Sequence, residues 1–385
     1  MVMQAEAPTD VATDPNVVPL AQPFLNGREI ELVTEVIRSG RLSLGPMLTR
    51  FENDFADFVG VRHAVAVSSG TAGLHVAAIT AGWGPGDEVI TSPFSFIASA
   101  NIARYTGASI RFADIDADTL NLDPLAVDAA VNHRTRGIVP VDIFGWPADM
   151  ISLDTIARHN GLTMVEDSCE ALGARFQGRM VGSGTGWPSV FAFYANKQLT
   201  TGEGGMLCTD DDDLAEQWRS LINQGRADTG QWLEHDRLGY NFRLSDIASA
   251  IGVAQLEKLP RMLAMRREVA HEYGRTLANI PGVTLPLADH DGNQRSWFVY
   301  WVVLDEDIDR DDVMAQLIER GIQCKPYLPS IHLQPMYREV GFTEGMFPVS
   351  ESISARSLAI PFFPTMSPQQ QARVAYELRE VLDVG

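Results

Sequence analysis

Short apolar runs recur in the first half of this 385-residue chain, and segments with a helical pattern lie between them. The runs fall at 65–67, 89–91, 110–113, 138–141, 163–165, 190–193 and 206–209. Such alternation predicts an α/β fold in which a mostly parallel, seven-stranded sheet is covered by helices. A chain of this length usually forms more than one domain.

The pattern changes after the last of these runs. Segment 244–259 has apolar residues at helical spacing and stops at Pro260, which predicts a helix that ends there and leaves the large domain. From about Arg261 a long helix leads to a smaller α+β part, with a strand at 296–304 and a helix at 311–320. We therefore predict a flexible leader at 1–20, a large domain at 21–260 and a smaller C-terminal domain at 261–385.

Lys197 lies between an aromatic, strand-like run and the glycine-rich turn 200–205. A lysine becomes a useful nucleophile when packing and neighbouring cations depress its pKa. Its commonest covalent use is a Schiff base with a carbonyl substrate or with pyridoxal phosphate. Because a surface lysine beside a turn is the plain alternative, the hypothesis depends on finding the other parts of such a site.

An acidic group follows a second buried strand, in segment 162–170. The carboxyl end of a strand faces the ligand crevice of an open α/β sheet. Pyridoxal phosphate needs a carboxylate beside its pyridine nitrogen, since a protonated ring withdraws electrons from the reacting carbon. Asp167 is the predicted partner of that nitrogen, and a helix cap would be the alternative role.

A turn of small residues follows the strand-like run 63–67 and opens a helical run. Backbone N–H groups at a helix N-terminus bind phosphate, so Gly70, Thr71 and Ala72 are predicted to hold the cofactor phosphate. An aromatic ring from segment 92–101 could stack on the pyridine ring, and we favour Phe96 over Phe94. Either phenylalanine could instead belong to the core.

These segments together resemble the DegT/StrS-type sugar aminotransferases, which are fold-type I pyridoxal phosphate enzymes, and the resemblance extends from Pro23 to the C-terminus. It implies pyridoxal 5'-phosphate as cofactor, with Thr71 at the phosphate, Asp167 at the ring nitrogen and Lys197 in the covalent bond. The family's asparagine in a segment like 237–246 reaches the partner's cofactor phosphate, so Asn241 implies a homodimer with composite active sites.

One position departs from the family pattern. The family usually has a phosphate-binding serine five residues before the lysine, and this chain has Ala192 there. One hydrogen bond to the phosphate is therefore absent or supplied by another group.

The resemblance also implies substrate contacts. Glu170 occupies a family position that faces the substrate, although an exposed helical glutamate would have the same sequence signature. The Pro-bounded loop 331–335 offers His332, for which a substrate contact and a structural role in the turn are equally favoured. Tyr194 is a further candidate contact or core residue. Cys169 is expected to line the cofactor pocket as packing and not as a nucleophile.

The sequence of segment 200–205 resembles that of enzymes that aminate C4 of a nucleotide-linked 4-keto-6-deoxy sugar. Segments 170–173 and 196–197 are similar to those of GDP-perosamine synthases. The implied reaction is ping-pong transfer of an amino group from an amino acid, expected to be L-glutamate. One alternative is a C3 keto-sugar or cyclitol (inosose) aminotransferase. Another is a catalytically silent member with a regulatory or assembly role.

Charge and composition restrict the partners and the location. A net charge of −20 argues against nucleic acid, whose binding depends on Lys and Arg. Local cations can still attract a small anionic substrate, and Arg243 is the favoured candidate among the nearby arginines. The eight histidines and three cysteines have no metal-ligand spacing, and no apolar run is long enough to span a membrane. The first twenty residues lack a signal-peptide pattern, so we expect a cytoplasmic protein.

Overall fold

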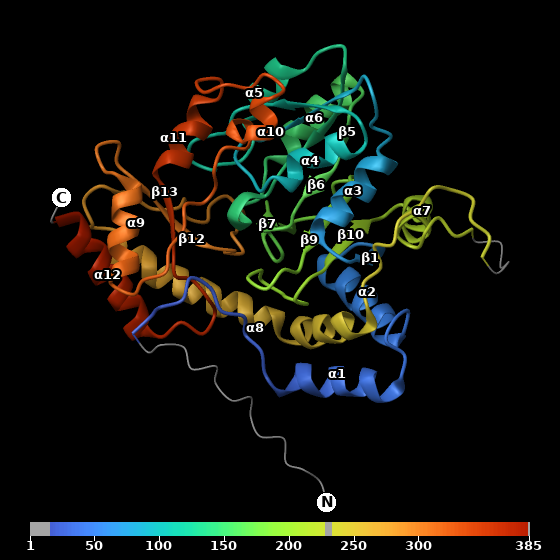
Figure 1. Ribbon diagram of the computed structural model, residues 1–385, viewed down its shortest axis with the longest axis horizontal. Helices are drawn as coiled ribbons and strands as arrows, with labels where there is room; N and C mark the ends of the chain where they lie inside the picture. The colour runs from blue at the N-terminus through green and yellow to red at the C-terminus, as the bar shows by residue number, and fades with distance from the viewer. Residues whose placement is uncertain (1–15, 228–232, 384–385) are drawn as a thin grey trace, which may run out of the picture.

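The computed structural model describes residues 16–227 and 233–383, and it confirms the predicted α/β fold (Figure 1). Two four-stranded ladders meet at residues 163–167, so they form one seven-stranded sheet when β5 and β6 are counted as a single strand. From edge to edge the order is β3 (Ser109–Phe112), β2 (Glu88–Thr91), β4 (Thr135–Val139), β5 (Thr163–Met164) with β6 (Glu166–Asp167), β9 (Ser189–Ala192), β10 (Gly205–Thr209) and β1 (His63–Val67).

Only β10 runs against its neighbours in this sheet, as far as the described strands extend. The carboxyl ends of β1, β6 and β9 consequently lie along the same side of the sheet, at the ends of the strands, together with the start of β10. Gly205 stands opposite both Ala192 and Val67 in the ladder. The segments that follow these strands therefore meet on the same side. Each of the seven predicted runs overlaps one strand.

Helices cover both faces of the sheet, and alternate residues of β1 contact different layers. Val65 and Val67 share a core with α3 (Gly70–Thr80), α4 (Ala98–Tyr105) and α7 (Asp212–Ile222). Ala64 and Ala66 pack with α1 (Gly27–Ser39), α2 (Pro46–Val59) and α8 (Asp246–Leu277). Near the other edge, a core containing Ile138 includes residues of α5 (Pro124–Ala130) and α6 (Met150–Asn160). The short elements η1 (Ile143–Gly145), β7 (Arg175–Phe176) and β8 (Arg179–Met180) complete this part.

The C-terminal part is a small antiparallel sheet with helices beside it. Its strands are β11 (Val283–Thr284), β12 (Tyr300–Leu304) and β13 (Ser357–Ile360), and its helices are α9 (Arg310–Glu319), η2 (Ile331–Leu333), α10 (Pro335–Arg338), α11 (Pro348–Arg356) and α12 (Pro368–Asp383). The helix predicted at 311–320 is confirmed. The strand predicted at 296–304 is too long, because Trp297 has a φ of 57° and Ser296 donates its N–H to Gly145 at 3.0 Å. That backbone leaves the extended conformation before β12 begins.

The prediction that a helix ends at Pro260 is wrong. Helix α8 is 32 residues long and continues through Pro260 to Leu277. It crosses from the large sheet to the C-terminal part, with α1 beneath it in Figure 1. Pro260 itself is exposed, whereas buried residues such as Leu256 and Val269 lie on both sides of it. The packing of these residues outweighs the roughly 3 kcal/mol that an interior proline costs a helix.

The predicted boundary between 21–260 and 261–385 therefore falls inside a helix, and the division stays a prediction. Most of the predicted leader lies outside the described residues. Its described end includes Val18, which is buried in the C-terminal core and donates its N–H to Gly321 at 2.8 Å.

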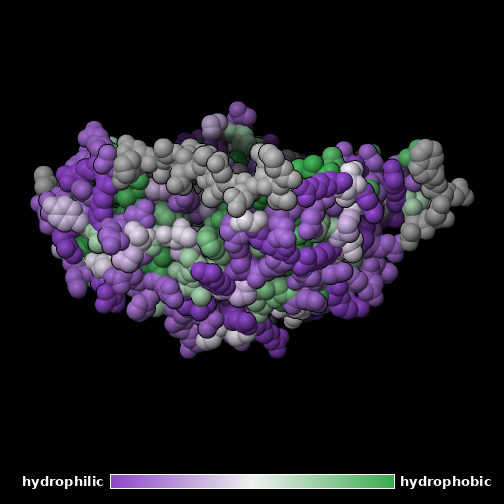
Figure 2. Space-filling view, turned by 90° about the horizontal axis from the view of Figure 1, so that it is seen from below, coloured by the Kyte–Doolittle hydropathy of each residue, from purple (hydrophilic) through white to green (hydrophobic). Residues whose placement is uncertain are grey.

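Hydrophilic residues predominate on the face shown in Figure 2, where hydrophobic residues form smaller patches. Among the helices that the structure describes, none has both the length and the apolar character needed to cross a membrane.

Candidate active site

A cavity of about 570 Å³ opens beside the carboxyl ends of β1, β6 and β9 and the start of β10. Eight of the predicted site residues line it: Gly70, Thr71, Phe96, Asp167, Cys169, Glu170, Tyr194 and Lys197. They come from separate segments of the chain, and the parallel arrangement of the strands brings these segments together.

Lys197 extends from the turn after β9 into this cavity, and its side chain is only 12% exposed. Its Nζ lies 3.4 Å from Glu170 Oε1 and 3.9 Å from the centre of the Phe298 ring. The face of the ring and the carboxylate both attract the lysine side chain. Lys197 is therefore a largely buried amine held between two side chains.

Glu170 is buried, and the burial raises its pKa although the neighbouring Lys197 lowers it. The Phe144 N–H donates to Glu170 Oε2 at 2.9 Å, and Gln198 donates to the Glu170 carbonyl oxygen. The exposed helical glutamate considered as an alternative is excluded by this burial. Glu170 faces Lys197 from the end of the β6 strand.

Asp167 is a buried carboxylate at the carboxyl end of β6. Ser99 Oγ donates to Asp167 Oδ2 at 2.6 Å, and the Cys169 N–H donates to Asp167 Oδ1 at 3.2 Å. In the part of the chain that the structure describes, no Lys, Arg or His side chain pairs with it. A buried carboxylate without a cation is costly, so this group suits a ligand that brings a positive charge.

The turn between β1 and α3 also lines the cavity. Gly70 begins α3, and the first N–H groups of a helix have no partner within it. A Cβ on Gly70 would lie 2.7 Å from the Cβ of Ala192 and 2.9 Å from Cys169 Sγ, so only glycine fits. Gly70 and Thr71 line the cavity, whereas the Ala72 N–H donates to the Ser69 hydroxyl at 3.1 Å. The structure thus directs the Ala72 N–H to the helix cap and not to the cavity.

The two phenylalanines of segment 92–101 differ in environment. Phe94 is fully buried against Phe144, while Phe96 is 60% exposed and lines the cavity. The choice of Phe96 as the candidate stacking residue agrees with this geometry.

Tyr194 and Cys169 also line the cavity. Tyr194 is 53% exposed, so it is not a core residue. Cys169 lies against Gly70, and burial raises the pKa of its thiol well above its usual value. A protonated thiol in this position is packing and not a nucleophile.

His332 is not at the cavity. Its side chain is completely buried, contacts the rings of Phe112 and Phe347, and lies 2.9 Å from Glu351. The prediction of a substrate contact is therefore corrected to the structural role that was its alternative. A loop histidine next to a proline gives no sequence signal for the direction of its side chain.

Asn241 also lies outside the lining of the cavity, on an exposed stretch that pairs with Asn223. Arg243, the predicted attractor of an anionic substrate, donates to the Asn223 side chain at 2.9 Å.

Sequence reasoning missed several residues around this cavity. Ser99 holds Asp167, and Phe298 and Tyr327 line the wall beside Lys197. Phe298 and Tyr327 come from the C-terminal part, more than 100 positions beyond the lysine. No motif in the sequence connects those segments with the lysine turn, so their approach follows only from the fold.

The donor set fits pyridoxal phosphate. A helix N-terminus with a glycine cradle is suited to the phosphate, a buried carboxylate without a cation is suited to the pyridinium nitrogen, and the Lys197 amine is suited to the aldehyde. Across the described residues, no group of three or more His, Cys, Asp or Glu side chains is placed to hold a metal ion.

Comparisons with known proteins agree with this geometry. The model of the DegT/DnrJ/EryC1/StrS aminotransferase family matches residues 23–379. The spore coat polysaccharide biosynthesis protein SpsC of Bacillus subtilis (strain 168) is 38% identical over 379 residues, which cover 95% of this chain and 97% of SpsC.

Solved structures give the same result. S. venezuelae DesV is 35% identical with a TM-score of 0.88, and the aminotransferase TlmJ from Streptoalloteichus hindustanus is 34% identical with a TM-score of 0.90. Each alignment covers 95% of this chain and 99% of the other. The chain therefore belongs to the DegT/DnrJ/EryC1/StrS aminotransferase family, has the fold-type I architecture, and is a pyridoxal-phosphate-dependent sugar aminotransferase.

Proposed function

We propose that this enzyme transfers an amino group from L-glutamate to C4 of a nucleotide-linked 4-keto-6-deoxy sugar by a ping-pong mechanism. The observation that carries the proposal is the meeting of Lys197, Asp167 and the α3 N-terminus at one cavity. The choice of C4 is supported by the sequence of segment 200–205. A sugar substrate is supported by the similarity to SpsC, a protein of polysaccharide biosynthesis.

Residues at the two ends of the cavity would hold the cofactor. The N–H groups of Gly70 and Thr71 would bind the phosphate, Phe96 would lie against the ring, and Asp167 would keep the pyridine nitrogen protonated. When bound, pyridoxal phosphate supplies an electron sink for the carbon that loses its proton. Ser99 fixes the Asp167 carboxylate through its 2.6 Å hydrogen bond.

Lys197 has two roles in this proposal. Its Nζ binds the cofactor covalently between turnovers, and once displaced it moves a proton from the donor's α-carbon. In the second half-reaction the same Nζ returns a proton to C4 of the sugar. Glu170 and the Phe298 ring keep the free amine inside the cavity, at 3.4 and 3.9 Å.

The sugar would occupy the wall formed by Glu170 and Tyr194, where a carboxylate and a phenol can bind hydroxyl groups. Tyr327 adds a second phenol to the lining. His332 is not included, since its side chain is buried away from the cavity.

We further propose a homodimer in which Asn241 contacts the cofactor phosphate of the partner. Support comes from the exposed position of Asn241 and from large apolar side chains that are exposed in one chain: Leu25, Ile30, Ile37, Leu42 and Leu44, on and beside α1, are each about half exposed. Apolar side chains gathered on one segment favour association. The cytoplasm remains the predicted location.

A comparison of keto substrates tests the position of amination. Enzyme loaded with pyridoxal phosphate is given L-glutamate and then, separately, a nucleotide-linked 4-keto-6-deoxy sugar, a 3-keto isomer or scyllo-inosose. We expect formation of 2-oxoglutarate to continue only with the 4-keto sugar, and NMR of the product to place nitrogen at C4. Turnover with the 3-keto sugar or with inosose alone would instead establish the alternative substrate class.

A further inference from the structure

Arg266 is a buried cation without an acidic partner. It lies on α8 and is 3% exposed, and among the described residues no carboxylate forms an ion pair with it. Burial lowers its pKa to about 10. Because an unpaired charge is costly in a protein interior, the hydrogen bonds that it makes are informative.

All three acceptors of the Arg266 guanidinium are backbone carbonyl oxygens. One terminal nitrogen donates to Trp297 at 3.1 Å and Phe298 at 3.3 Å, and the other donates to Lys197 at 3.3 Å. The guanidinium therefore joins the turn that holds the lysine to a distant segment of the C-terminal part.

That distant segment covers the lysine. The Phe298 ring lies 3.9 Å from Lys197 Nζ and lines the cavity. Arg266 thus contacts the backbone of the lysine and the backbone of the residue whose ring touches the amine of that lysine. One side chain fixes both partners of a contact inside the cavity.

The same two segments meet at a second point. Gln198, next to the lysine, donates to Ser296 Oγ at 2.8 Å and to the Glu170 carbonyl oxygen. Trp297 has a φ of 57°, a conformation that non-glycine residues adopt only where the surroundings impose it. The connection between the lysine turn and segment 296–298 is therefore a built feature of the fold.

We propose that Arg266 is a positioning residue for Lys197, which keeps the lysine backbone and the Phe298 ring in one fixed arrangement. The proposal rests on the role of Lys197 in the proposed function. The amine must leave its covalent bond and return to the same place in every half-reaction, and small displacements of a reacting group cost rate. Of the titratable groups near the amine, Glu170 lies 3.4 Å from Lys197 Nζ, Cys169 interacts with it electrostatically, and Asp167 lines the same cavity. Arg266 acts on the lysine through its backbone carbonyl oxygen.

The test uses cofactor-free protein and two probes. Pyridoxal phosphate reacts with Lys197: the amine adds to the aldehyde carbon, a C=N bond replaces the C=O bond, and one water leaves. Pyridoxamine phosphate has no aldehyde, so it reports only non-covalent binding. The rate constant of covalent capture at saturating pyridoxal phosphate is measured by stopped-flow absorbance, and the affinity for pyridoxamine phosphate by calorimetry.

Arg266→Met removes the donors at similar side-chain length, and Arg267→Met is the matched control at the adjacent exposed position of α8. We expect Arg266→Met to slow covalent capture by about 10-fold or more. The affinity for pyridoxamine phosphate should change by less than about 3-fold. Arg266→Lys, which keeps the charge and one donor site, should recover part of the rate. Arg267→Met should match the wild type in both measurements.

An unchanged capture rate in Arg266→Met would overturn the proposal. So would a parallel loss of capture rate and pyridoxamine phosphate affinity, since that result belongs to a residue that only shapes the cavity. If Arg266→Met does not fold, Arg266→Lys is tested in its place. The same comparison is made between its loss of capture rate and its loss of pyridoxamine phosphate affinity. No keto sugar enters this experiment, so an error in the proposed substrate leaves its outcome unaffected.

Discussion

Ala192 lines the cavity beside the start of α3. A Cβ on Gly70 would be 2.7 Å from the Ala192 Cβ, so a side-chain atom at position 192 is next to the α3 N-terminus. The usual serine of the family would place a hydroxyl there. In the proposed site, its absence would leave the N–H groups at the start of α3 as the main phosphate donors within one chain.

We predict that Ala192→Ser tightens binding of pyridoxamine phosphate by about 3- to 10-fold, because one added hydrogen bond contributes on the order of 1 kcal/mol. Calorimetry on cofactor-free protein measures this affinity. Ala195→Ser is the control, since Ala195 is exposed and is not among the residues that line the cavity. Equal effects of the two substitutions would show that position 192 does not contact the phosphate.

The sequence predicted those site residues that belong to strand ends and turns. Lys197, Asp167 and Gly70 follow strands whose order in an α/β sheet brings their ends together, so local patterns were sufficient. Arg266 and Phe298 have no such pattern, because their contacts depend on how the C-terminal part packs. For His332 the sequence left a substrate contact and a structural role equally favoured, and only the structure decides for the second, since burial among Phe112 and Phe347 is a tertiary property.

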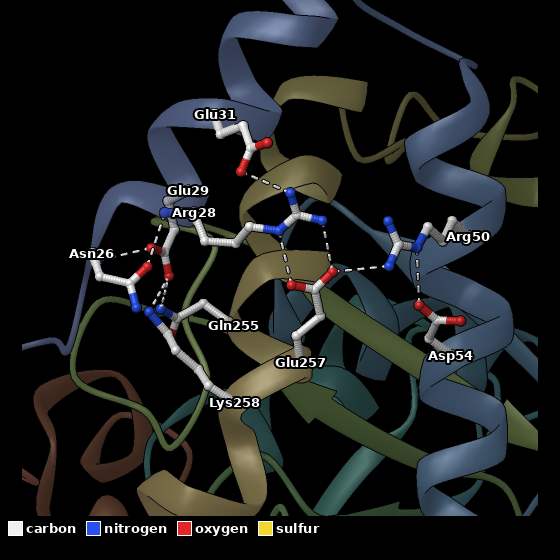
Figure 3. A network of polar contacts seen from close by, with 9 residues as sticks. All are labelled: Asn26, Arg28, Glu29, Glu31, Arg50, Asp54, Gln255, Glu257 and Lys258. Carbon is white, nitrogen blue, oxygen red and sulfur yellow. Dashed lines mark hydrogen bonds and ion pairs between the residues drawn. The ribbon is translucent and has the colours of Figure 1, made fainter. Parts of the chain in front are cut away.

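Helix α8 connects the two parts of the molecule and is held along its first half by α1 and α2. Figure 3 shows Glu257 between Arg28 and Arg50, and Glu29 facing Gln255 and Lys258. The Glu29–Lys258 pair is 2.5 Å long with side chains only 7% and 12% exposed, whereas the Arg28–Glu31 pair is much more exposed. The buried pair therefore contributes more to attaching α1.

We predict that Glu29→Gln lowers the free energy of unfolding at pH 7 by about 1–3 kcal/mol, because Lys258 loses its partner in a buried position. The exposed control Glu31→Gln should change it by less than about 0.5 kcal/mol. Urea denaturation of the two variants and the wild type gives the comparison. A loss in Glu31→Gln as large as that in Glu29→Gln would refute the distinction.

The effect of Glu29→Gln should also depend on pH. Burial raises the pKa of Glu29, but hydrogen bonds and the ion pair with Lys258 bring it below the usual value. A depressed pKa in the folded state gives stability that is present above the unfolded value, about 4.3, and is lost as pH falls through the folded value. The difference between wild type and Glu29→Gln should therefore shrink below about pH 4. A difference that grows on acidification would contradict this account.

Helical periodicity predicted where α8 begins, and the rule against interior proline predicted its end incorrectly. Pro260 is exposed, and buried residues of α8 on both sides of it pack into the two cores. A local rule fails here because two cores contact one helix.

The proposed homodimer needs two chains to complete each pair of active sites. Lys197 of one chain would work with Asn241 of the other, and an isolated chain would have an incomplete phosphate site. This arrangement can be tested without a structure of the dimer. Two inactive variants can complement each other only if each active site takes Lys197 from one chain and Asn241 from the other.

We predict that Lys197→Ala and Asn241→Ala, each weakly active or inactive at limiting cofactor, regain about a quarter of wild-type activity after mixed unfolding and reassociation. Half of the reassociated dimers are mixed, and each mixed dimer has one site with both wild-type residues. Turnover of L-glutamate and the keto sugar measures the recovery. If both residues served the same chain's site, no recovery would occur.

Lys197 carries the aminotransferase chemistry proposed for this chain, and an absorbance spectrum reports on this lysine directly. Purified protein loaded with pyridoxal phosphate is titrated with L-glutamate, and Lys197→Ala is treated in parallel. In the wild type we expect a visible band from the lysine-bound cofactor, which bleaches as one equivalent of 2-oxoglutarate forms, whereas Lys197→Ala should lack this band and form no 2-oxoglutarate on the same timescale. A wild-type protein that never acquires the band, or a Lys197→Ala variant that forms 2-oxoglutarate at the wild-type rate, would refute the role of Lys197.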